Sequence, residues 1–213
     1  MDWTYNEALR EDIVNRVRTR FGNREGIHLS DLTLCLRKPY FRKKGLSPSI
    51  SDEQVLLYIS GFGLQGQLFP LNGETYSLDD IKCTPDYIGP NKELIEIKST
   101  RASSAKFHLE DMAHWLMQVV GYMKVIGVLE ADLAVFFITG NYHPPFPSLD
   151  VWTLKASKSE VEANWREILK RKAVLEKALK DDKAPLTEWT QTWEYRYCEN
   201  QKLCPDCPGA KRR

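Results

Sequence analysis

The sequence has no apolar run long enough to cross a lipid bilayer. Its longest apolar stretch, VVGYMKVIGVL, is interrupted by Lys124 and is much shorter than a membrane-spanning helix. The amino-terminal segment MDWTYNEALREDIV is acidic and amphipathic, so it lacks the basic start and apolar block of a secretory signal peptide. These absences argue against a membrane partner and predict a cytoplasmic protein.

Linker-like tracts and charge bias are also missing. The 213 residues contain no long segment rich in serine, glycine or proline and no visible repeat, which predicts one globular domain, 1–213. The formal net charge of +1 gives no bias toward a partner of either sign.

One basic segment breaks this balance. RKPYFRKKG places its cations around two aromatic residues, which would suit a phosphate backbone. The alternative is a solvated loop. The cations are Arg37, Lys38, Arg42, Lys43 and Lys44.

Residue patterns predict helices and strands in alternation. Helical spacing covers 6–21, 51–69, 108–127 and 157–182, and the second of these begins with a Ser-x-x-Gln capping box. A short helix capped near Ser30 or Asp31 is expected within 28–38. Strand patterns cover 75–78, 82–88, 93–99, 133–140 and 150–156. A helix between strands is a crossover connection, so the expected fold class is α/β with a mixed central sheet flanked by helices.

Two acids and a lysine stand in a hairpin pattern where apolar residues are expected. In CTPDYIGPNKELIEIKST, the period of two puts Glu96 and Lys98 on one face of the second strand. If Gly89 pairs with Glu93 across a three-residue loop, Asp86 lies opposite Glu96 on that face. A four-residue loop would turn Asp86 away unless a bulge intervenes. The favoured register gathers two carboxylates and one ammonium group.

Such a cluster is suited to metal-assisted hydrolysis. Two carboxylates at hydrogen-bonding distance repel each other unless a proton or a cation lies between them, and oxygen ligands favour Mg²⁺ or Mn²⁺. The ion could activate water, and Lys98 could orient or help deprotonate that water and stabilise charge developing on a phosphate. The alternative is a salt-bridged edge strand, in which Lys98 only neutralises Glu96.

The order of these residues resembles the PD-(D/E)xK nuclease superfamily. Asp86 is followed by Glu96-x-Lys98 and then by a helix with Gln118-x-x-x-Tyr122. The pattern is similar to that of RecB-type nuclease domains. Two further segments, SDLTLCLRKPYFRKK and WEYRYCENQKLC, look like the terminal cysteine segments of the CRISPR-associated and phage-encoded iron–sulfur exonucleases.

The resemblance covers about residues 28–207 and implies a fold. It implies a restriction-endonuclease-like core at about 65–155 within a single nuclease domain. Cysteine-bearing elements at 28–45 and 185–207 would come together as an elaboration formed by both termini.

The resemblance also implies roles for single residues. Asp86 and Glu96 would bind the metal ion together with the backbone carbonyl of Ile97. Lys98 would be the catalytic lysine.

The helical motif and the basic residues would act on DNA. Gln118 and Tyr122 share one helical face and would help to position DNA and the lysine, and the Tyr122 ring could stack on bases. A buried amide needs hydrogen-bond partners, so Gln118 could equally be a satisfied core residue. The groove would be lined by the basic segment, Lys98 and Arg101.

The chain departs from the family at one metal ligand. Many relatives carry histidine in a Gly-x-x-x-His pattern, whereas GFGLQ places Gln65 there. An amide oxygen ligates Mg²⁺ but is a weaker ligand for Mn²⁺ than imidazole, which predicts reduced activity or an altered metal preference. His108 and His114 are expected to be cap-region or packed histidines.

The cysteines match the family only in part. Relatives show one early cysteine and then Cys-x2-Cys-x5-Cys, and Tyr195 stands where the first of the late trio is expected. The remaining thiolates could hold a [4Fe–4S] cluster or Zn²⁺, or could bind no metal. A disulfide is not expected in a cytosolic chain, and Cys83 is interpreted as a small buried hydrophobe. The candidate ligands are Cys35, Cys198, Cys204 and Cys207.

Two functions are compatible with these features. The first is a metal-dependent deoxyribonuclease, more an exonuclease than an endonuclease, acting on single-stranded DNA ends or flaps. It would serve CRISPR spacer acquisition or phage recombination, in the latter case in the host-cell cytoplasm, with integrase or recombination proteins as possible partners. The second is a catalytically weak nucleic-acid-binding scaffold that docks to an integrase or helicase. Such a scaffold has no need of the acid pair and lysine together.

Overall fold

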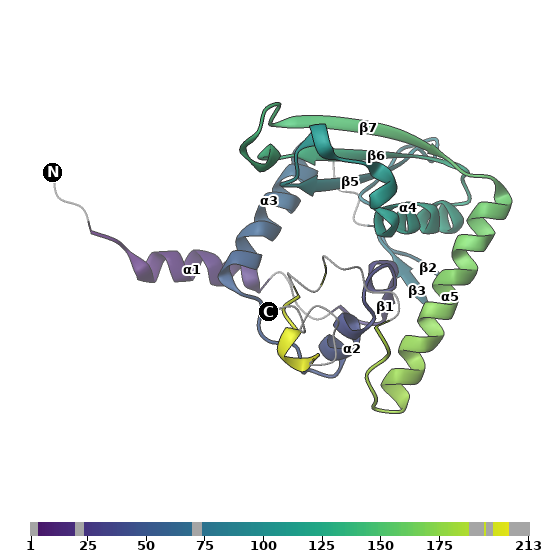
Figure 1. Cartoon of the computed structure of the whole chain (residues 1–213), viewed down its shortest axis with the longest axis horizontal. Coiled ribbons are helices and arrows are strands. Elements are labelled where there is room, and N and C mark those ends of the chain that lie inside the picture. The colour runs from purple at the N-terminus through teal and green to yellow at the C-terminus, as the bar shows by residue number, and fades with distance from the viewer. Residues whose placement is uncertain (1–3, 20–23, 70–73, 188–193, 195–197, 205–213) are drawn as a thin grey trace.

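The computed structural model describes residues 4–19, 24–69, 74–187, 194 and 198–204. Its helices are α1 (Glu7–Arg18), α2 (Arg37–Lys43), α3 (Asp52–Leu68), α4 (Ala113–Ile126) and α5 (Lys158–Lys180) (Figure 1). Its strands are β1 (Ile27–His28), β2 (Tyr76–Leu78), β3 (Ile81–Cys83), β4 (Tyr87–Ile88), β5 (Leu94–Thr100), β6 (Glu130–Phe137) and β7 (Ser148–Lys155).

The larger sheet confirms the expected mixed α/β class. Its order is β4-β5-β6-β7, with β5 and β6 parallel and the outer two pairs antiparallel. A parallel pair needs a long crossover, and α4 supplies it between β5 and β6. The smaller sheet has the order β1-β3-β2.

Two local predictions were wrong. The single strand expected over 82–88 is divided, because β3 pairs within the smaller sheet and β4 pairs with β5. Pro85 lies between them and has no N–H to donate to either ladder. The short helix expected over 28–38 is a single 3-10 turn at Leu29–Asp31, and α2 begins only at Arg37.

Helix starts follow the predicted capping chemistry. The Ser51 hydroxyl accepts a hydrogen bond from the Gln54 N–H at 3.3 Å, and the Gln54 side chain accepts one from the Ser51 N–H at 3.2 Å. Ser157 and Glu160 form the same box at the start of α5. These boxes fix where the two longest helices begin.

The core lies between the larger sheet, α4 and α5. Leu133 and Val135 on β6 are fully buried, as is Ile168 on α5. Gly121 lets α4 approach its neighbours, since a Cβ there would lie 2.8 Å from Leu29 Cδ2 and 3.0 Å from Ile168 Cδ1. Burying each such aliphatic side chain contributes about 2 kcal/mol to the free energy of unfolding. This packing holds α4 rigidly against the strands.

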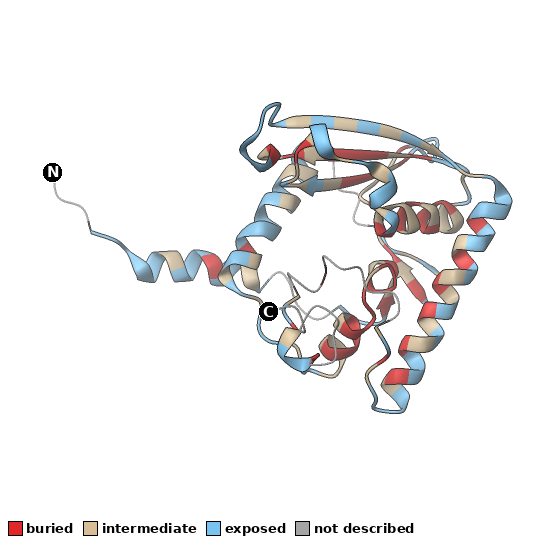
Figure 2. Cartoon of the chain, viewed as in Figure 1, coloured by how far each residue is buried: buried red, intermediate tan, exposed pale blue. Residues whose placement is uncertain are grey.

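The amino-terminal helices are covered far less. Figure 2 shows α1 and α3 as mostly exposed or half-buried, with Val14 and Val55 as their buried residues, while buried residues are more frequent on β6, α4, α2 and one stripe of α5. α1 projects from the body beside the start of α3 (Figure 1). None of the helices in the described ranges combines the length and apolar character needed to cross a membrane.

Candidate active site

The acidic hairpin has the favoured register. Tyr87 pairs with Ile95, and the Gly89 N–H donates to the Glu93 carbonyl at 2.8 Å, so the loop has three residues. One step further along this register, Asp86 lies opposite Glu96. The Asp86 Oδ2 atom accepts a hydrogen bond from the Ile97 N–H at 2.8 Å, which fixes the carboxylate beside β5.

Lys98 lies on the same face of β5 as Glu96, as the strand period predicts. Its Nζ is 2.5 Å from Glu96 Oε1 and donates to Gln118 Oε1 at 3.1 Å. Gln118 Nε2 in turn donates to Glu96 Oε1 at 3.0 Å. α4 therefore holds the acid and the lysine through one buried amide, whose hydrogen bonds are those of the satisfied core glutamine that was one of the two alternatives.

Tyr122 fixes this amide from one helical turn further along. Its hydroxyl accepts from Gln118 Nε2 at 2.9 Å and donates to the Thr84 carbonyl at 3.3 Å. The side chain is 4% exposed, so the expectation that its ring stacks on bases is wrong. Tyr122 links α4 to the segment that leads into Asp86.

Burial controls the electrostatics of the acids. Glu96 is 2% exposed, and burial raises its pKa to about 7, against the opposing effect of Lys98. Burial also raises the pKa of Asp86. Glu96 Oε2 is buried and has no hydrogen-bond partner within the described residues. A buried oxygen without a donor fits a cation or a proton.

The metal ligands implied by the sequence lie around this point. Asp86, Glu96 and the Ile97 backbone share one end of the hairpin, and Gln65 Nε2 lies 3.4 Å from the Ile97 carbonyl oxygen. One turn earlier on α3, a Cβ at Gly61 would lie 3.4 Å from Ser99 Oγ, so this face of α3 runs along β5. Two carboxylates and a carbonyl suit Mg²⁺, which commonly completes its shell with water and substrate phosphate.

His114 lies one turn before Gln118 on α4. It is buried, and its ring packs against Trp115 with centroids 5.5 Å apart, which confirms the packed histidine. Burial lowers its pKa to about 4, and the charge of Lys98 adds to this effect. His114 is therefore neutral beside the lysine at physiological pH.

The raised pKa of Glu96 makes the stability of the metal-free protein depend on pH. Between its ordinary value of 4.5 and about 7, the folded state holds this proton more tightly than the unfolded chain does. Over this window the unfolded chain ionises Glu96 while the folded protein keeps it protonated, so the free energy of unfolding should fall by about 3 kcal/mol as the pH rises. Glutamine does not ionise, so E96Q lacks this fall in the free energy of unfolding. The stability of E96Q relative to wild type should therefore increase as the pH rises from 4.5 to about 7.

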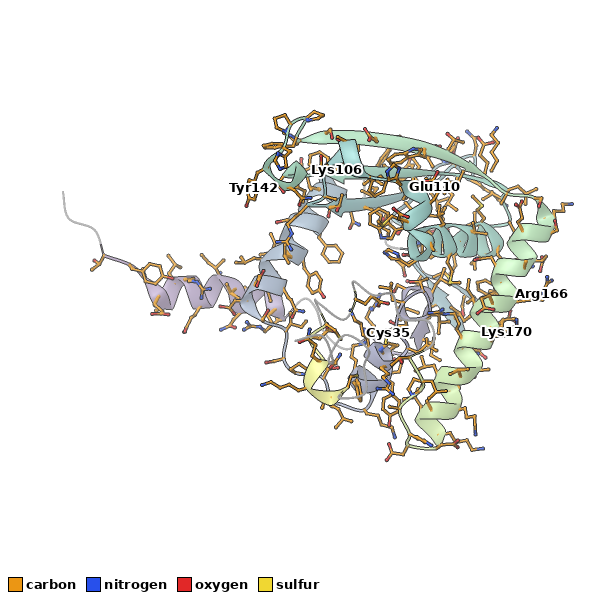
Figure 3. All side chains as sticks on the ribbon, viewed as in Figure 1. Cys35, Lys106, Glu110, Tyr142, Arg166 and Lys170 are labelled. Carbon is orange, nitrogen blue, oxygen red and sulfur yellow. The ribbon has the colours of Figure 1, made fainter. Side chains whose placement is uncertain are left out.

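Urea unfolding of both proteins in EDTA at pH 5 and pH 8 measures this difference. The two proteins must be compared with each other, because neutral His114 contributes a slope of the opposite sign. The exposed Glu110, labelled in Figure 3, provides the matched control E110Q. A stability difference between E96Q and wild type that does not change with pH would contradict the burial of an ionisable Glu96.

The basic segment forms α2 rather than a loop. Figure 1 shows α2 across the molecule from β5. Its cationic side chains have hydrogen-bond or ion-pair partners within the protein, which weakens their attraction for DNA phosphates. These pairs are Arg37 Nε with the Pro185 carbonyl at 2.7 Å, Lys38 with Glu199 at 3.9 Å, Arg42 with Asp31 at 2.6 Å, Lys43 with the Gly26 carbonyl, and Lys44 with Asp182 at 2.7 Å. Arg101, by contrast, is exposed at the end of β5.

The cysteine segments contact each other. The Cys35 N–H donates to Glu194 Oε1 at 3.1 Å, and Cys204 is buried. Burial raises the pKa of Cys198, and nearby Cys204 adds to the effect. Cys207 and Tyr195 lie outside the described residues. Among the residues that are described, no three histidine, cysteine or acidic side chains are grouped to hold a metal ion.

Cys83 behaves as the predicted small hydrophobe. It is fully buried on β3, and burial raises the pKa of its thiol to about 12. It is therefore unsuited to bind metal as a thiolate.

The fold has counterparts among solved structures. The protein SSO0001 matches with a TM-score of 0.60 and 18% identity over 92% of this chain and 96% of that chain. A phage-related exonuclease from Haemophilus somnus 129PT matches with a TM-score of 0.52 and 12% identity over 80% of this chain and 99% of that chain. No protein-family model and no curated protein matches the sequence.

These likenesses are of fold. The chain has a restriction-endonuclease-like α/β core, with its mixed sheet flanked by helices. The acid pair and lysine lie on the central strand β5 and its hairpin partner, within that core.

Proposed function

We propose that the chain is a metal-dependent DNA nuclease of the PD-(D/E)xK type. The observation that carries this proposal is that Asp86 and Lys98 both lie beside the carboxyl group of Glu96: Lys98 contacts Glu96 Oε1, and the buried Oε2 atom lacks a donor among the described residues. A structural salt bridge normally satisfies a buried oxygen, whereas a metal site leaves it open for the ion. The exonuclease with a similar fold supports the same conclusion.

Each residue of the cluster has a distinct role. Asp86, Glu96 and the Ile97 carbonyl would hold Mg²⁺ or Mn²⁺, which supplies a Lewis acid for the phosphate and lowers the pKa of bound water. Lys98 keeps its ammonium group beside the acids, where it stabilises negative charge on the phosphate oxygens or orients the attacking water. Lys98 is the only one of these groups that brings its own positive charge.

Gln118 and Tyr122 act as positioning residues. Gln118 touches both Lys98 and Glu96, and Tyr122 holds the Gln118 amide in the orientation that donates to Glu96. The buried network keeps the acid and the lysine in place before DNA arrives. It does not itself contact the reacting phosphate.

The substrate we propose is a single-stranded DNA end or flap, cut as an exonuclease. The resemblance to iron–sulfur exonucleases supports a role in trimming CRISPR spacers or in phage recombination, alongside an integrase or recombination proteins. The test is to incubate the protein and Mn²⁺ with linear single-stranded DNA, closed circular single-stranded DNA and blunt duplex. The two single-stranded forms distinguish an exonuclease from an endonuclease, and the duplex tests the preference for single strands. Degradation of linear but not circular DNA is expected, and cleavage of both at equal rates would overturn the exonuclease assignment.

The scaffold alternative is less well supported. A scaffold would gain nothing from a buried Glu96 whose carboxyl group costs stability when ionised. Such a cost is usual where a site serves chemistry.

We also propose that the terminal cysteines hold a [4Fe–4S] cluster, whose binding would have to draw Cys35, Cys198 and Cys204 together, because the structure does not group these described thiols for a metal ion. Cys35, Cys198 and Cys204 would provide three thiolates and Cys207 the fourth. Iron analysis and visible absorption of anaerobically purified protein test this directly. Zinc without iron would point to a tetrahedral structural site instead, and neither metal would overturn both assignments.

Gln65 should limit the rate with Mn²⁺. Its amide lies beside the Ile97 carbonyl, so Gln65→His would place imidazole next to the proposed metal ligands. We expect Q65H to raise the Mn²⁺-dependent cleavage rate several-fold and the Mg²⁺-dependent rate less, because imidazole favours Mn²⁺ over Mg²⁺. Initial rates of Q65H, Q65A and wild type with each metal measure this. Equal rates for all three proteins would remove Gln65 from the site.

A further inference from the structure

The loop between β6 and β7 presents an aromatic side chain to solvent. Tyr142 is 84% exposed and lies at one end of the larger sheet (Figure 3). Single exposed aromatics are common on soluble proteins, so exposure alone assigns nothing. Two further features indicate a function for Tyr142: the conformation of its backbone and the position of its loop.

The backbone holds Tyr142 in an unfavourable conformation. Asn141 and Tyr142 have φ values of 51° and 66°, in the left-handed region that a bulky residue rarely adopts. Hydrogen bonds maintain it: the Tyr142 N–H donates to the Thr139 carbonyl at 2.7 Å and the Asn141 N–H donates to the Arg101 carbonyl at 2.8 Å. Burial of the ring does not offset this backbone strain, because the ring is exposed. We infer that the strained backbone holds the ring in solvent, where a ligand can reach it.

The base of the loop is packed closely. Gly140 has a φ of 52°, and a Cβ there would lie 3.1 Å from the Phe146 side chain. The Ile138 N–H donates to the Thr100 carbonyl at 2.9 Å. The loop is thus tied to the end of β5 and built as a rigid support for Tyr142.

That support stands close to the proposed active site. Arg101, whose carbonyl anchors the loop, follows Lys98 by three residues, which is about 10 Å along an extended strand. Three stacked nucleotides span about the same length. The Arg101 side chain is exposed and makes no ion pair with the described residues. The backbone bond between Arg101 and Asn141 therefore joins the segment that carries the exposed cation to the loop that carries the exposed ring, about three nucleotides from Lys98 along the strand.

We propose that Tyr142 and Arg101 form a binding site for single-stranded DNA, in which the Tyr142 ring stacks on a base and Arg101 binds a neighbouring phosphate. This inference rests on the proposed nuclease function and deepens it by naming the feature that selects the substrate. Bases within a duplex already stack on each other and hide their faces, so the ring selects unpaired bases. The site recognises no particular base, because every base has an aromatic face.

Binding to labelled oligothymidylate in EDTA tests the stacking. Y142A should weaken binding about tenfold, while Y142F should bind as wild type does, since phenylalanine retains the ring. An oligonucleotide of abasic residues should bind wild type and Y142A equally. The matched control is Y5A, because Tyr5 is 73% exposed and lies before α1, away from the sheet.

Arg101 should act through charge rather than through the base. R101A should weaken binding to both the normal and the abasic strand and lower the slope of log K against log salt concentration by about 0.7, the value for one phosphate on a single strand. The exposed Arg166 on α5, labelled in Figure 3, provides the control R166A.

The outcomes separate this inference from the function on which it rests. If wild type binds and cleaves DNA but Y142A binds the normal strand equally well, the stacking site is wrong and the nuclease assignment stands. If wild type neither binds nor cleaves any DNA, the proposed function fails. A change in oligomeric state of Y142A with unchanged DNA binding would make the loop a protein interface and overturn the inference.

Discussion

Replacing Lys98 by alanine should lower the rate of DNA cleavage about a thousandfold. Lys98 Nζ is the only cation within hydrogen-bonding distance of Glu96 among the described residues, and no neighbouring side chain there can replace its charge. DNA affinity should change little, because phosphates along the strand contribute most of the binding free energy. Single-turnover cleavage with Mn²⁺, measured beside DNA affinity in EDTA, separates the two effects.

A lysine elsewhere provides the control for K98A. Lys170, labelled in Figure 3, is exposed on α5 and pairs with Glu167 of the same helix, so K170A should cleave at the wild-type rate. K98R tests whether charge alone is sufficient, since the planar guanidinium cannot occupy the same position between Glu96 and Gln118. Wild-type rates in a contaminant-free sample of K98A would remove Lys98 from the mechanism.

Replacing Glu96 by glutamine should remove metal binding and activity together and yet stabilise the metal-free fold. The amide keeps the size of the side chain but removes a buried charge, one oxygen of which has no hydrogen-bond partner among the described residues. We expect Mn²⁺ affinity to fall at least tenfold and cleavage about a hundredfold or more. A gain in stability with a loss of function is typical of a site strained for chemistry.

Isothermal titration with Mn²⁺ and urea unfolding at pH 8 measure both effects of E96Q. D86N should weaken Mn²⁺ binding as well, with a smaller change in stability because Asp86 is only half-buried and accepts the Ile97 N–H. Unchanged Mn²⁺ affinity in both variants would show that the acid pair is a structural salt bridge and not a metal site.

The geometry of the hairpin could be predicted because it depends on local rules. The period of two fixes the shared face of Glu96 and Lys98, and the three-residue loop fixes Asp86 opposite Glu96. The one-turn spacing of Gln118 and Tyr122 likewise fixes their shared helical face. Each of these depends on residues close in sequence.

Features that depend on distant partners could not be predicted. The cations of α2 pair with residues far along the chain, such as Asp182 and the Pro185 carbonyl, and no local pattern indicates this. Tyr122 is buried because α4 packs against both β5 and α5, which the helix sequence alone does not specify. The exposure of Tyr142 could not be predicted because the left-handed backbone that presents it has no clear sequence signature beyond Gly-Asn.

The measurement that tests the acid pair most directly is cleavage of end-labelled single-stranded DNA by wild type and E96Q, each with Mn²⁺ and with EDTA. We predict cleavage by wild type with Mn²⁺ only, and Mn²⁺-dependent cleavage by E96Q that is slower by about a hundredfold or more. The position of the retained label would also give the polarity of digestion. Equal Mn²⁺-dependent cleavage by the two proteins, or none by a wild type that still binds DNA, would contradict the assignment of the hairpin as a nuclease active site.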